Sequence, residues 1–145
     1  MAKAEISKVL NVSLDKLFAT ICAYDKYPEF VDNVKSTTVE RLSDTKAKVT
    51  YKVSLIKDVE YSLELNEKRD GDKATVSWKL LEGKAFQKND GGWKLESVGP
   101  DKTKIHYHVD VDFNFPAPGF VIKSIVSGTL PGMIQAFEER ARGRG

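Results

Sequence analysis

The sequence predicts an α+β protein in which a curved antiparallel sheet wraps around a long C-terminal helix. Within residues 47–113, several segments alternate between apolar and polar residues, which is typical of strands with one covered face and one wet face. Between Pro118 and Arg142 the apolar residues instead recur at steps of three and four, which is typical of an amphipathic helix. We expect this helix to cover the apolar face of the sheet, because no other segment is suited to do so.

Length and composition indicate a single domain that spans residues 1–145. The chain is 41% hydrophobic and 30% charged, which is ordinary for a globular protein. A formal net charge of +2, with both signs interleaved, gives no indication of a nucleic-acid partner. The single cysteine, Cys22, excludes an internal disulfide and suits a reducing compartment. Since the sequence shows no signal-peptide pattern and no apolar run of membrane-spanning length, we expect a cytoplasmic protein.

We expect the N-terminal part of the chain to form one strand and two helices. Residues Ala4 to Val12 alternate as a strand does, and Ser13 is suited to cap the helix that follows. Pro28 is suited to the first turn of a second, short helix within residues 25–34. This second helix would turn Phe30 toward the core.

Six antiparallel strands are expected between the short helix and the C-terminal helix. The alternating segments are separated by residues that favour tight turns. These turn signals are Ser43-Asp44, Lys57-Asp58, Asp70-Gly71-Asp72, Glu82-Gly83 and Gly99-Pro100-Asp101. The predicted order is therefore one strand, two helices, six strands and one long helix.

One residue does not suit the predicted C-terminal helix. Pro131 lies within the apolar stripe, where it would remove a backbone donor and clash with the preceding turn. The stripe keeps its phase across Pro131, which a loop of arbitrary length would not ensure. We therefore expect one long helix that is kinked near Gly128 to Pro131.

The predicted inner face of the sheet carries an unusual number of large aromatic residues. A tyrosine hydroxyl or an indole N–H needs a hydrogen-bond partner when it is buried. Two interpretations follow: the hydroxyls reach water at the rim of a solid core, or they line a ligand-sized cavity between sheet and helix. The residues concerned are Tyr51, Tyr61, Trp78, Trp93, Tyr107 and Phe113.

A row of potential metal ligands lies on one strand, formed by His106, His108, Asp110 and Asp112. Residues two apart on a strand are separated by about 7 Å, which is too far for one ion to bind all four. The alternation also places the row on the outer face of the sheet. We therefore predict a solvated face, and we expect neither a metal nor another cofactor.

The sequence gives little support for catalysis. Cys22 has no cationic neighbour close in sequence that would activate it, so we expect a structural thiol. No glycine-rich loop opens a helix after a strand, and no inward arginine, histidine or carboxylate is evident on the sheet. Arg41 is ambiguous, because the register of its segment is not fixed by the pattern. We therefore predict no catalytic residue.

Several short motifs occur in an order and spacing that resemble one protein superfamily. The chain is similar to the SRPBCC, or START-like, helix-grip superfamily, and within it to the polyketide cyclase/dehydrase and coenzyme Q-binding branch. The resemblance covers nearly the whole chain. The motifs are AYDKYPEF at 23–30, Glu82-Gly83, Phe86, GWKL at 92–95, Thr103, the strand at 107–115, and Leu130, Met133, Ala136-Phe137 and Arg140-Ala141 in the last helix.

This resemblance implies a hydrophobic tunnel, closed by the final helix, that holds a prenyl, acyl or polyketide-like ligand such as a prenylated quinone or lipid. A carrier or chaperone of such a ligand would contact membrane surfaces transiently. The oligomeric state is not predicted. The expected ligand-binding residues are Phe30, Tyr51, Tyr61, Trp78, Trp93, Tyr107, Met133 and Phe137.

Two other functions remain open, because this fold serves several unrelated roles. One is a polyketide cyclase/dehydratase-type enzyme, and the other is a protein-interaction module, for example at the ribosome. Buried ionisable groups in the cavity would favour the enzyme. A purely apolar and aromatic lining would favour the carrier, and a filled core with an exposed basic patch would favour the interaction module.

Overall fold

The computed structural model describes residues 2–54, 58–114, 119–124 and 128–143. Its elements follow one another as β1 (Ala2–Leu10), α1 (Leu14–Cys22), the 3-10 helix η1 (Tyr24–Glu29), β2 (Val34–Arg41), β3 (Lys46–Ser54), β4 (Asp58–Asp70), β5 (Lys73–Glu82), β6 (Phe86–Gly99), β7 (Lys102–Phe113), α2 (Gly119–Lys123) and α3 (Leu130–Arg142). This order confirms the predicted strand, two helices and six strands, followed by a helical C-terminal segment.

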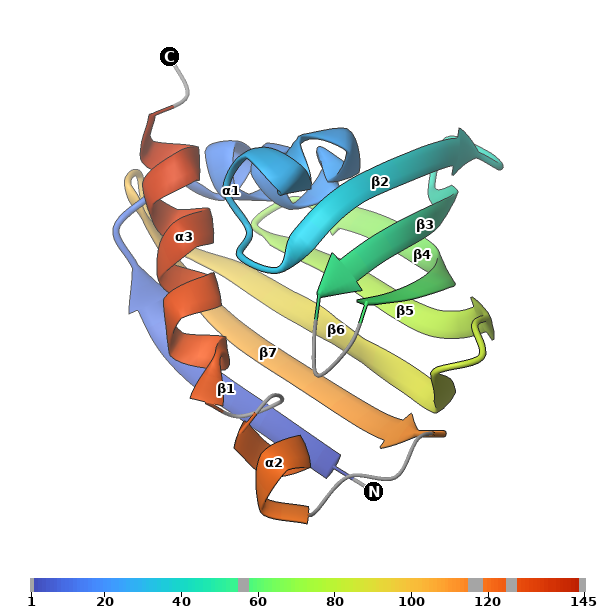
Figure 1. Ribbon diagram of the computed structural model, residues 1–145. Helices are drawn as coiled ribbons and strands as arrows, with labels where there is room; N and C mark the ends of the chain where they lie inside the picture. The colour runs from blue at the N-terminus through green and yellow to red at the C-terminus, as the bar shows by residue number, and fades with distance from the viewer. Residues whose placement is uncertain (1, 55–57, 115–118, 125–127, 144–145) are drawn as a thin grey trace.

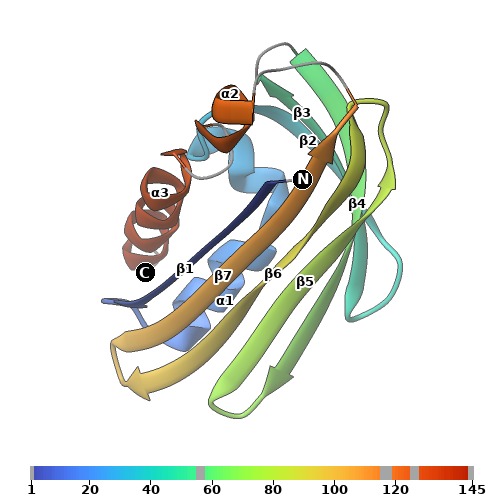
Figure 2. The ribbon, with the colours of Figure 1, turned by 90° about the horizontal axis from the view of Figure 1, so that it is seen from below.

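The seven strands form one antiparallel sheet in the order β1-β7-β6-β5-β4-β3-β2. Strands β2 to β6 each pair with the next strand in sequence. Strand β1 instead pairs with the last strand, β7, so that Ile6 lies opposite Tyr107. The sheet is curved, and α1 and α3 lie on its concave side (Figure 1). The view from below shows the same arrangement (Figure 2). The predicted architecture, a curved sheet against a C-terminal helix, is therefore confirmed.

Helix α1 begins as the sequence predicts. The Oγ of Ser13 accepts a hydrogen bond from the backbone N–H of Lys16 at 3.3 Å, which satisfies one of the free donors of the first turn. Leu17 and Ile21, on one side of the helix, are fully buried in the core. Because α1 also contacts α3, the two helices close one end of the concave face together.

Where the sequence predicts a single helix between residues 118 and 142, the described residues form the two α-helices α2 and α3. Helix α2 ends at Lys123, α3 begins at Leu130, and Pro131 lies in the first turn of α3. A first-turn backbone N–H has no partner within the helix, so proline at this position breaks no hydrogen bond and needs no kink. The apolar stripe continues on α3, where Leu130, Ile134 and Phe137 are buried. Residues 125–127 of the predicted stripe lie outside the described part of the chain.

The outer face of the sheet is polar and its charges are paired across strands. Glu64 of β4 lies 4.0 Å from both Lys46 and Lys79 on the neighbouring strands. In the row of residues His106 to Asp112, which was predicted to be a solvated face, His106 Nδ1 lies 2.5 Å from the Oγ of Ser7 on β1. The carboxylate of Asp110 accepts a hydrogen bond from Lys88 Nζ at 2.9 Å. Among the described residues, no group of three or more potential ligands is arranged to hold a metal ion.

Within the described ranges, no helix is long and apolar enough to cross a bilayer.

Candidate functional site

A cavity of about 240 Å³ lies between the concave face of the sheet and α3. Strands β3 to β7 supply most of its lining, and the rest comes from α1, from the segment around η1 and from the start of α3. Seven of the eight predicted ligand-binding residues line this cavity, and they are Tyr51, Tyr61, Trp78, Trp93, Tyr107, Met133 and Phe137. Phe30 does not line it. Its ring instead packs against that of Phe137, with centroids 5.0 Å apart.

The aromatic residues of the lining form a continuous set of ring contacts. Tyr51 and Tyr61 stack across β3 and β4 with centroids 5.2 Å apart. Tyr107 contacts both indoles, at 5.6 Å for Trp78 and 4.9 Å for Trp93. Such contacts stabilise a pair by about 0.5–1.5 kcal/mol beyond the burial of its apolar area. The rings therefore hold one another in place around the cavity.

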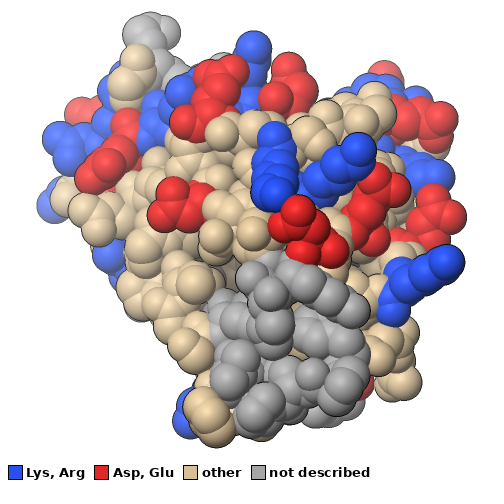
Figure 3. Space-filling model, viewed as in Figure 1, with Lys and Arg blue, Asp and Glu red and all other residues tan. Residues whose placement is uncertain are grey.

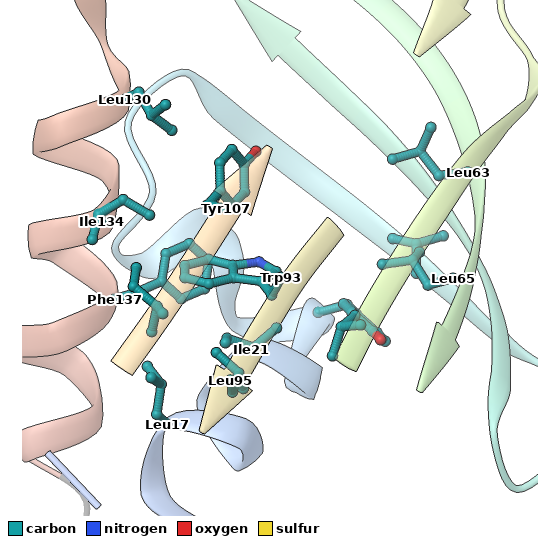
Figure 4. Packing of buried hydrophobic residues seen from close by; sticks show 14 of the residues in the cluster. Leu17, Ile21, Leu63, Leu65, Trp93, Leu95, Tyr107, Leu130, Ile134 and Phe137 are labelled. Carbon is teal, nitrogen blue, oxygen red and sulfur yellow. The ribbon is translucent and has the colours of Figure 1, made fainter. Parts of the chain in front are cut away.

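Helix α3 supplies the wall opposite the sheet. Leu130, Ile134 and Phe137 project from it toward Trp93 and Tyr107 (Figure 4). Phe137 meets the indole of Trp93 edge-on, with centroids 5.2 Å apart. The half-buried side chain of Met133, from the same helix, also lines the cavity. The 3.6-residue period of the helix therefore directs this stripe into the space that the sheet encloses.

The hydroxyls of Tyr51, Tyr61 and Tyr107 have no hydrogen-bond partner among the residues that the structure describes. Tyr24 and Tyr27 differ, since Tyr24 donates to Glu67 and Tyr27 donates to the backbone carbonyl of Ile21. Burial raises the pKa of Tyr51, and the nearby hydroxyls of Tyr61 and Tyr107 raise it further. Burial likewise raises the pKa of Tyr61 and that of Tyr107. All three side chains are therefore neutral phenols at physiological pH, and they add polar groups to an otherwise apolar lining.

Asn89 is a site residue that the sequence analysis did not identify. It lies on β6, its side chain is 7% exposed, and it lines the cavity. The indole Nε1 of Trp78 donates a hydrogen bond to Asn89 Oδ1 at 3.3 Å. Asn89 is an even number of residues from Trp93 and Leu95, both of which are buried, so a regular strand directs all three to the same face. This alternation is the feature of the sequence that indicates an inward position for Asn89.

Two glycines make room for the aromatic residues. A Cβ on Gly91 would lie 2.6 Å from Cζ2 of Trp78 and 2.4 Å from the backbone oxygen of His108. Gly83 has φ +151°, and a Cβ there would lie 2.6 Å from the Cβ of Tyr61. A side chain at either position would collide with its neighbour. Because glycine has no side chain, Trp78 can lie against Gly91 and Tyr61 against Gly83.

Arg41, whose direction on the sheet the sequence pattern left open, belongs to a polar cluster outside the cavity. Its guanidinium forms two hydrogen bonds with the carboxylate of Glu67, at 2.9 and 3.1 Å. Tyr24 donates to the same carboxylate at 2.5 Å. Burial, together with the charge of Glu67, raises the pKa of the Cys22 thiol to about 12. Arg41 and Glu67 therefore join β2 and β4, and neither residue lines the cavity.

Charged side chains contribute little to the lining. Among the described residues that line the cavity, Asp32 is the one with a charged side chain, and it is exposed. The lining is otherwise aliphatic and aromatic, with a few neutral polar groups. Such a lining suits an apolar ligand with a small number of oriented polar contacts.

The curved sheet, the C-terminal helix and the cavity between them define a helix-grip protein of the START-like class. Residues 10–138 match the family model described as polyketide cyclase / dehydrase and lipid transport. The chain therefore belongs to this family, and the predicted resemblance to START-like proteins of the polyketide cyclase/dehydrase type is confirmed.

Solved structures of the same fold are similar over almost the whole chain. A START superfamily protein from Mycobacterium smegmatis matches with a TM-score of 0.81 and 16% identity, covering 97% of each chain. The ZhuI aromatase/cyclase from Streptomyces sp. R1128 matches with a TM-score of 0.82 and 11% identity, covering 97% of this chain and 93% of that one. Human STARD10 matches with a TM-score of 0.84 and 14% identity, covering 97% of this chain and 63% of that one.

One curated relative is similar in sequence. The persistence and stress-resistance toxin PasT of Escherichia coli O6:H1 is 22% identical over 142 residues, which covers 98% of this chain and 88% of PasT. At these identities the similarities establish the fold, and function has to be argued from the cavity.

Proposed function

We propose that the protein binds a hydrophobic small molecule in the cavity between the sheet and α3, and that it acts as a carrier or chaperone for that molecule. The observation that carries this proposal is the lining, which is apolar and aromatic and holds three phenolic hydroxyls without described partners. Buried polar groups normally have partners, so these hydroxyls are suited to bind a ligand. The family description, which includes lipid transport, supports the same function.

The size of the cavity limits the ligand. Pockets that enclose drug-sized ligands are typically about 300–1,000 Å³, and this cavity measures about 240 Å³. A prenylated quinone, a lipid or a polyketide-like molecule would place a ring or a short chain inside, and a longer chain would extend beyond the cavity. Burial of apolar surface at about 25 cal/mol per Å² favours micromolar binding of such a molecule.

A polyketide cyclase/dehydratase-type activity has less support. Such chemistry needs a group that can exchange a proton near neutral pH. The pKa of Tyr61 and that of Tyr107 are raised by burial, away from this range. Asp32, the charged residue among the described lining, is exposed to solvent. The lining therefore favours binding over acid–base catalysis.

A protein-interaction role, for example at the ribosome, also has less support. It is suggested by the similarity to PasT, whose name describes a toxin. A filled core would be expected for a module that binds only through its surface, and this core encloses a cavity. Lysine and arginine side chains are interspersed with aspartate and glutamate on the face shown in Figure 3. The described residues of this face therefore form no extended basic surface.

Binding is tested by native mass spectrometry of the purified protein and by titration with quinones and fatty acids. Trp78 and Trp93 line the cavity, so a saturable change in tryptophan fluorescence is expected. Met133→Trp should fill the cavity and abolish this change, whereas Gln135→Trp, on the exposed side of α3, should leave it intact. A wild-type protein that carries no ligand and gives no saturable signal would contradict the proposed function.

Exchange of such a ligand would involve transient contact with a membrane surface. Phe120 of α2 is 76% exposed and is suited to this contact. Cosedimentation with lipid vesicles, compared between wild type and Phe120→Ala, tests this membrane contact.

Because Cys22 is the single cysteine and is unpaired, we also propose a reducing, cytoplasmic location, which fractionation of the host cell would test.

A further inference from the structure

We propose that the cavity selects a neutral ligand that carries a carbonyl oxygen, and that the side-chain amide of Asn89 binds this oxygen. The inference rests on the proposed binding function and adds the chemical class of the ligand. It follows from the orientation of one amide group, from what fixes that orientation, and from the charges that the lining lacks.

The orientation of the Asn89 amide is set by Trp78. An indole N–H can only donate a hydrogen bond, so the atom of Asn89 that faces Nε1 of Trp78, at 3.3 Å, has to be the amide oxygen. The NH₂ group of Asn89 then points away from the indole. It has no partner among the described residues, although the side chain is only 7% exposed and lines the cavity. Asn89 therefore presents unused N–H donors to the cavity.

Trp78 is itself held in place, so the amide cannot easily turn over. The indole lies against Gly91, where even a methyl group would come within 2.6 Å of the ring. On another side it contacts the ring of Tyr107 at 5.6 Å. Reversing the amide would place its NH₂ group against the indole N–H and lose the hydrogen bond. The donor direction is therefore fixed before a ligand arrives, which reduces the entropic cost of binding.

The remaining polar groups favour a neutral acceptor over a charged one. The hydroxyls of Tyr51, Tyr61 and Tyr107 can also donate to a ligand oxygen. No lysine, arginine or histidine is found among the described residues of the lining. A carboxylate would lose its hydration without gaining a counter-ion, which is costly, whereas a carbonyl oxygen needs only donors. An aromatic ketone or quinone meets both conditions, and its ring can pack among the aromatic side chains.

The proposal is tested with three naphthalene probes of similar size: acetylnaphthalene, which has a carbonyl, ethylnaphthalene, which has none, and naphthoate, which is charged. Dissociation constants are measured by isothermal titration calorimetry at neutral pH. Wild-type protein should bind acetylnaphthalene roughly tenfold more tightly than either other probe, the effect of about one net hydrogen bond. The infrared C=O stretch of the bound ketone should also shift to lower frequency.

Two variants assign the effect to Asn89. Asn89→Leu should weaken the binding of acetylnaphthalene by roughly tenfold and leave that of ethylnaphthalene unchanged. Asn66→Leu is the matched control, because Asn66 lies on the same sheet but does not line the cavity. Should Asn89→Leu fail to fold, Asn89→Asp takes its place, because it keeps an acceptor for Trp78 and removes the amide donors, and it should weaken the binding of acetylnaphthalene in the same way. Unchanged binding of acetylnaphthalene by a folded Asn89 variant would overturn the role of Asn89.

The outcomes distinguish this inference from the function on which it rests. Equal affinity for ketone and hydrocarbon, or an unshifted C=O stretch, would overturn the role of Asn89 and leave the binding function standing. Tighter binding of naphthoate than of acetylnaphthalene would overturn the preference for a neutral ligand. If none of the three probes binds and no ligand is recovered with the purified protein, both proposals are wrong.

Discussion

Phe137 is the residue at which α3, the sheet and η1 meet. Its ring is 2% exposed and meets three other rings edge-on: Tyr27 at 5.2 Å, Phe30 at 5.0 Å and Trp93 at 5.2 Å. It also borders the cavity. A side chain with packed neighbours on most sides loses those contacts when it is truncated, even if one side faces a void.

We predict that Phe137→Ala lowers the free energy of unfolding by about 3 kcal/mol, the lower end of the range for buried phenylalanine. The value is at the lower end because part of the ring faces the cavity. Chemical denaturation measures this change. Met133→Ala is the comparison, since Met133 is half-buried on the same helix and should cost clearly less. Equal losses for the two variants would contradict the described packing of Phe137.

Cys22 illustrates how burial controls the chemistry of a single side chain. Its pKa is raised from 9.0 to about 12, first by burial and then by the negative charge of Glu67. A raised pKa favours the neutral thiol, whereas the thiolate is the form that reacts. The structure therefore agrees with the prediction of a structural thiol.

We predict that native Cys22 reacts with iodoacetamide about a thousandfold more slowly near neutral pH than the same cysteine in denatured protein. This factor follows from the pKa difference, because each unit lowers the thiolate fraction about tenfold. The rate should keep rising with pH beyond the ordinary pKa of a free thiol, for as long as the protein stays folded. Mass spectrometry of the labelled protein measures both rates. Rapid labelling of the native protein would contradict the burial of this thiol.

At the scale of elements, α3 shows how position decides the effect of a proline. Pro131 lies in the first turn, with Thr129 as the capping residue. Backbone N–H groups there have no acceptor within the helix. Gln135, one turn further on, lies in the helix interior and is exposed.

We predict that Pro131→Ala changes the free energy of unfolding by less than about 1 kcal/mol, because no hydrogen bond is restored and only chain entropy changes. Gln135→Pro should destabilise the protein by about 3 kcal/mol or more. Thermal or chemical denaturation of both variants tests the contrast. A large effect of Pro131→Ala would indicate that this proline bends a longer helix after all.

At the scale of the whole molecule, one core joins the two ends of the chain. Strand β1 pairs with β7, and Thr103 at the start of β7 donates a hydrogen bond to the backbone oxygen of Val12 at 2.8 Å. The backbone N–H of Asn11 donates to Glu138 of α3 at 2.7 Å. Buried residues from the helices and the strands form a single cluster. We therefore propose that the chain folds as one domain.

A single domain predicts a single cooperative unfolding transition. Tryptophan fluorescence reports Trp78 and Trp93 in the sheet, and circular dichroism near 222 nm reports the helices. The two denaturation curves should coincide, because α3 and the sheet share one core. Separate midpoints would indicate that the helices unfold independently of the sheet.

Residue patterns along the chain were enough to predict the layers of the fold and seven of the residues that line the cavity. Alternation along the strands is a local property, so it identified Tyr51, Trp93 and Tyr107 as inward residues without any knowledge of strand order. The helical period likewise placed Met133 and Phe137 on the face that meets the sheet. These predictions succeeded because one side of each element has to be buried in any arrangement that the chain adopts.

Features that depend on contacts between distant segments became evident from the three-dimensional arrangement alone. Local spacing could not reveal that Asn89 binds Trp78, that Gly91 makes room for its indole, or that Phe30 packs against Phe137. It also could not show that Pro131 lies in the first turn of a helix, since the same apolar stripe fits one kinked helix or two shorter ones. Each of these features depends on the relative positions of elements, and those positions are fixed by packing over the whole core.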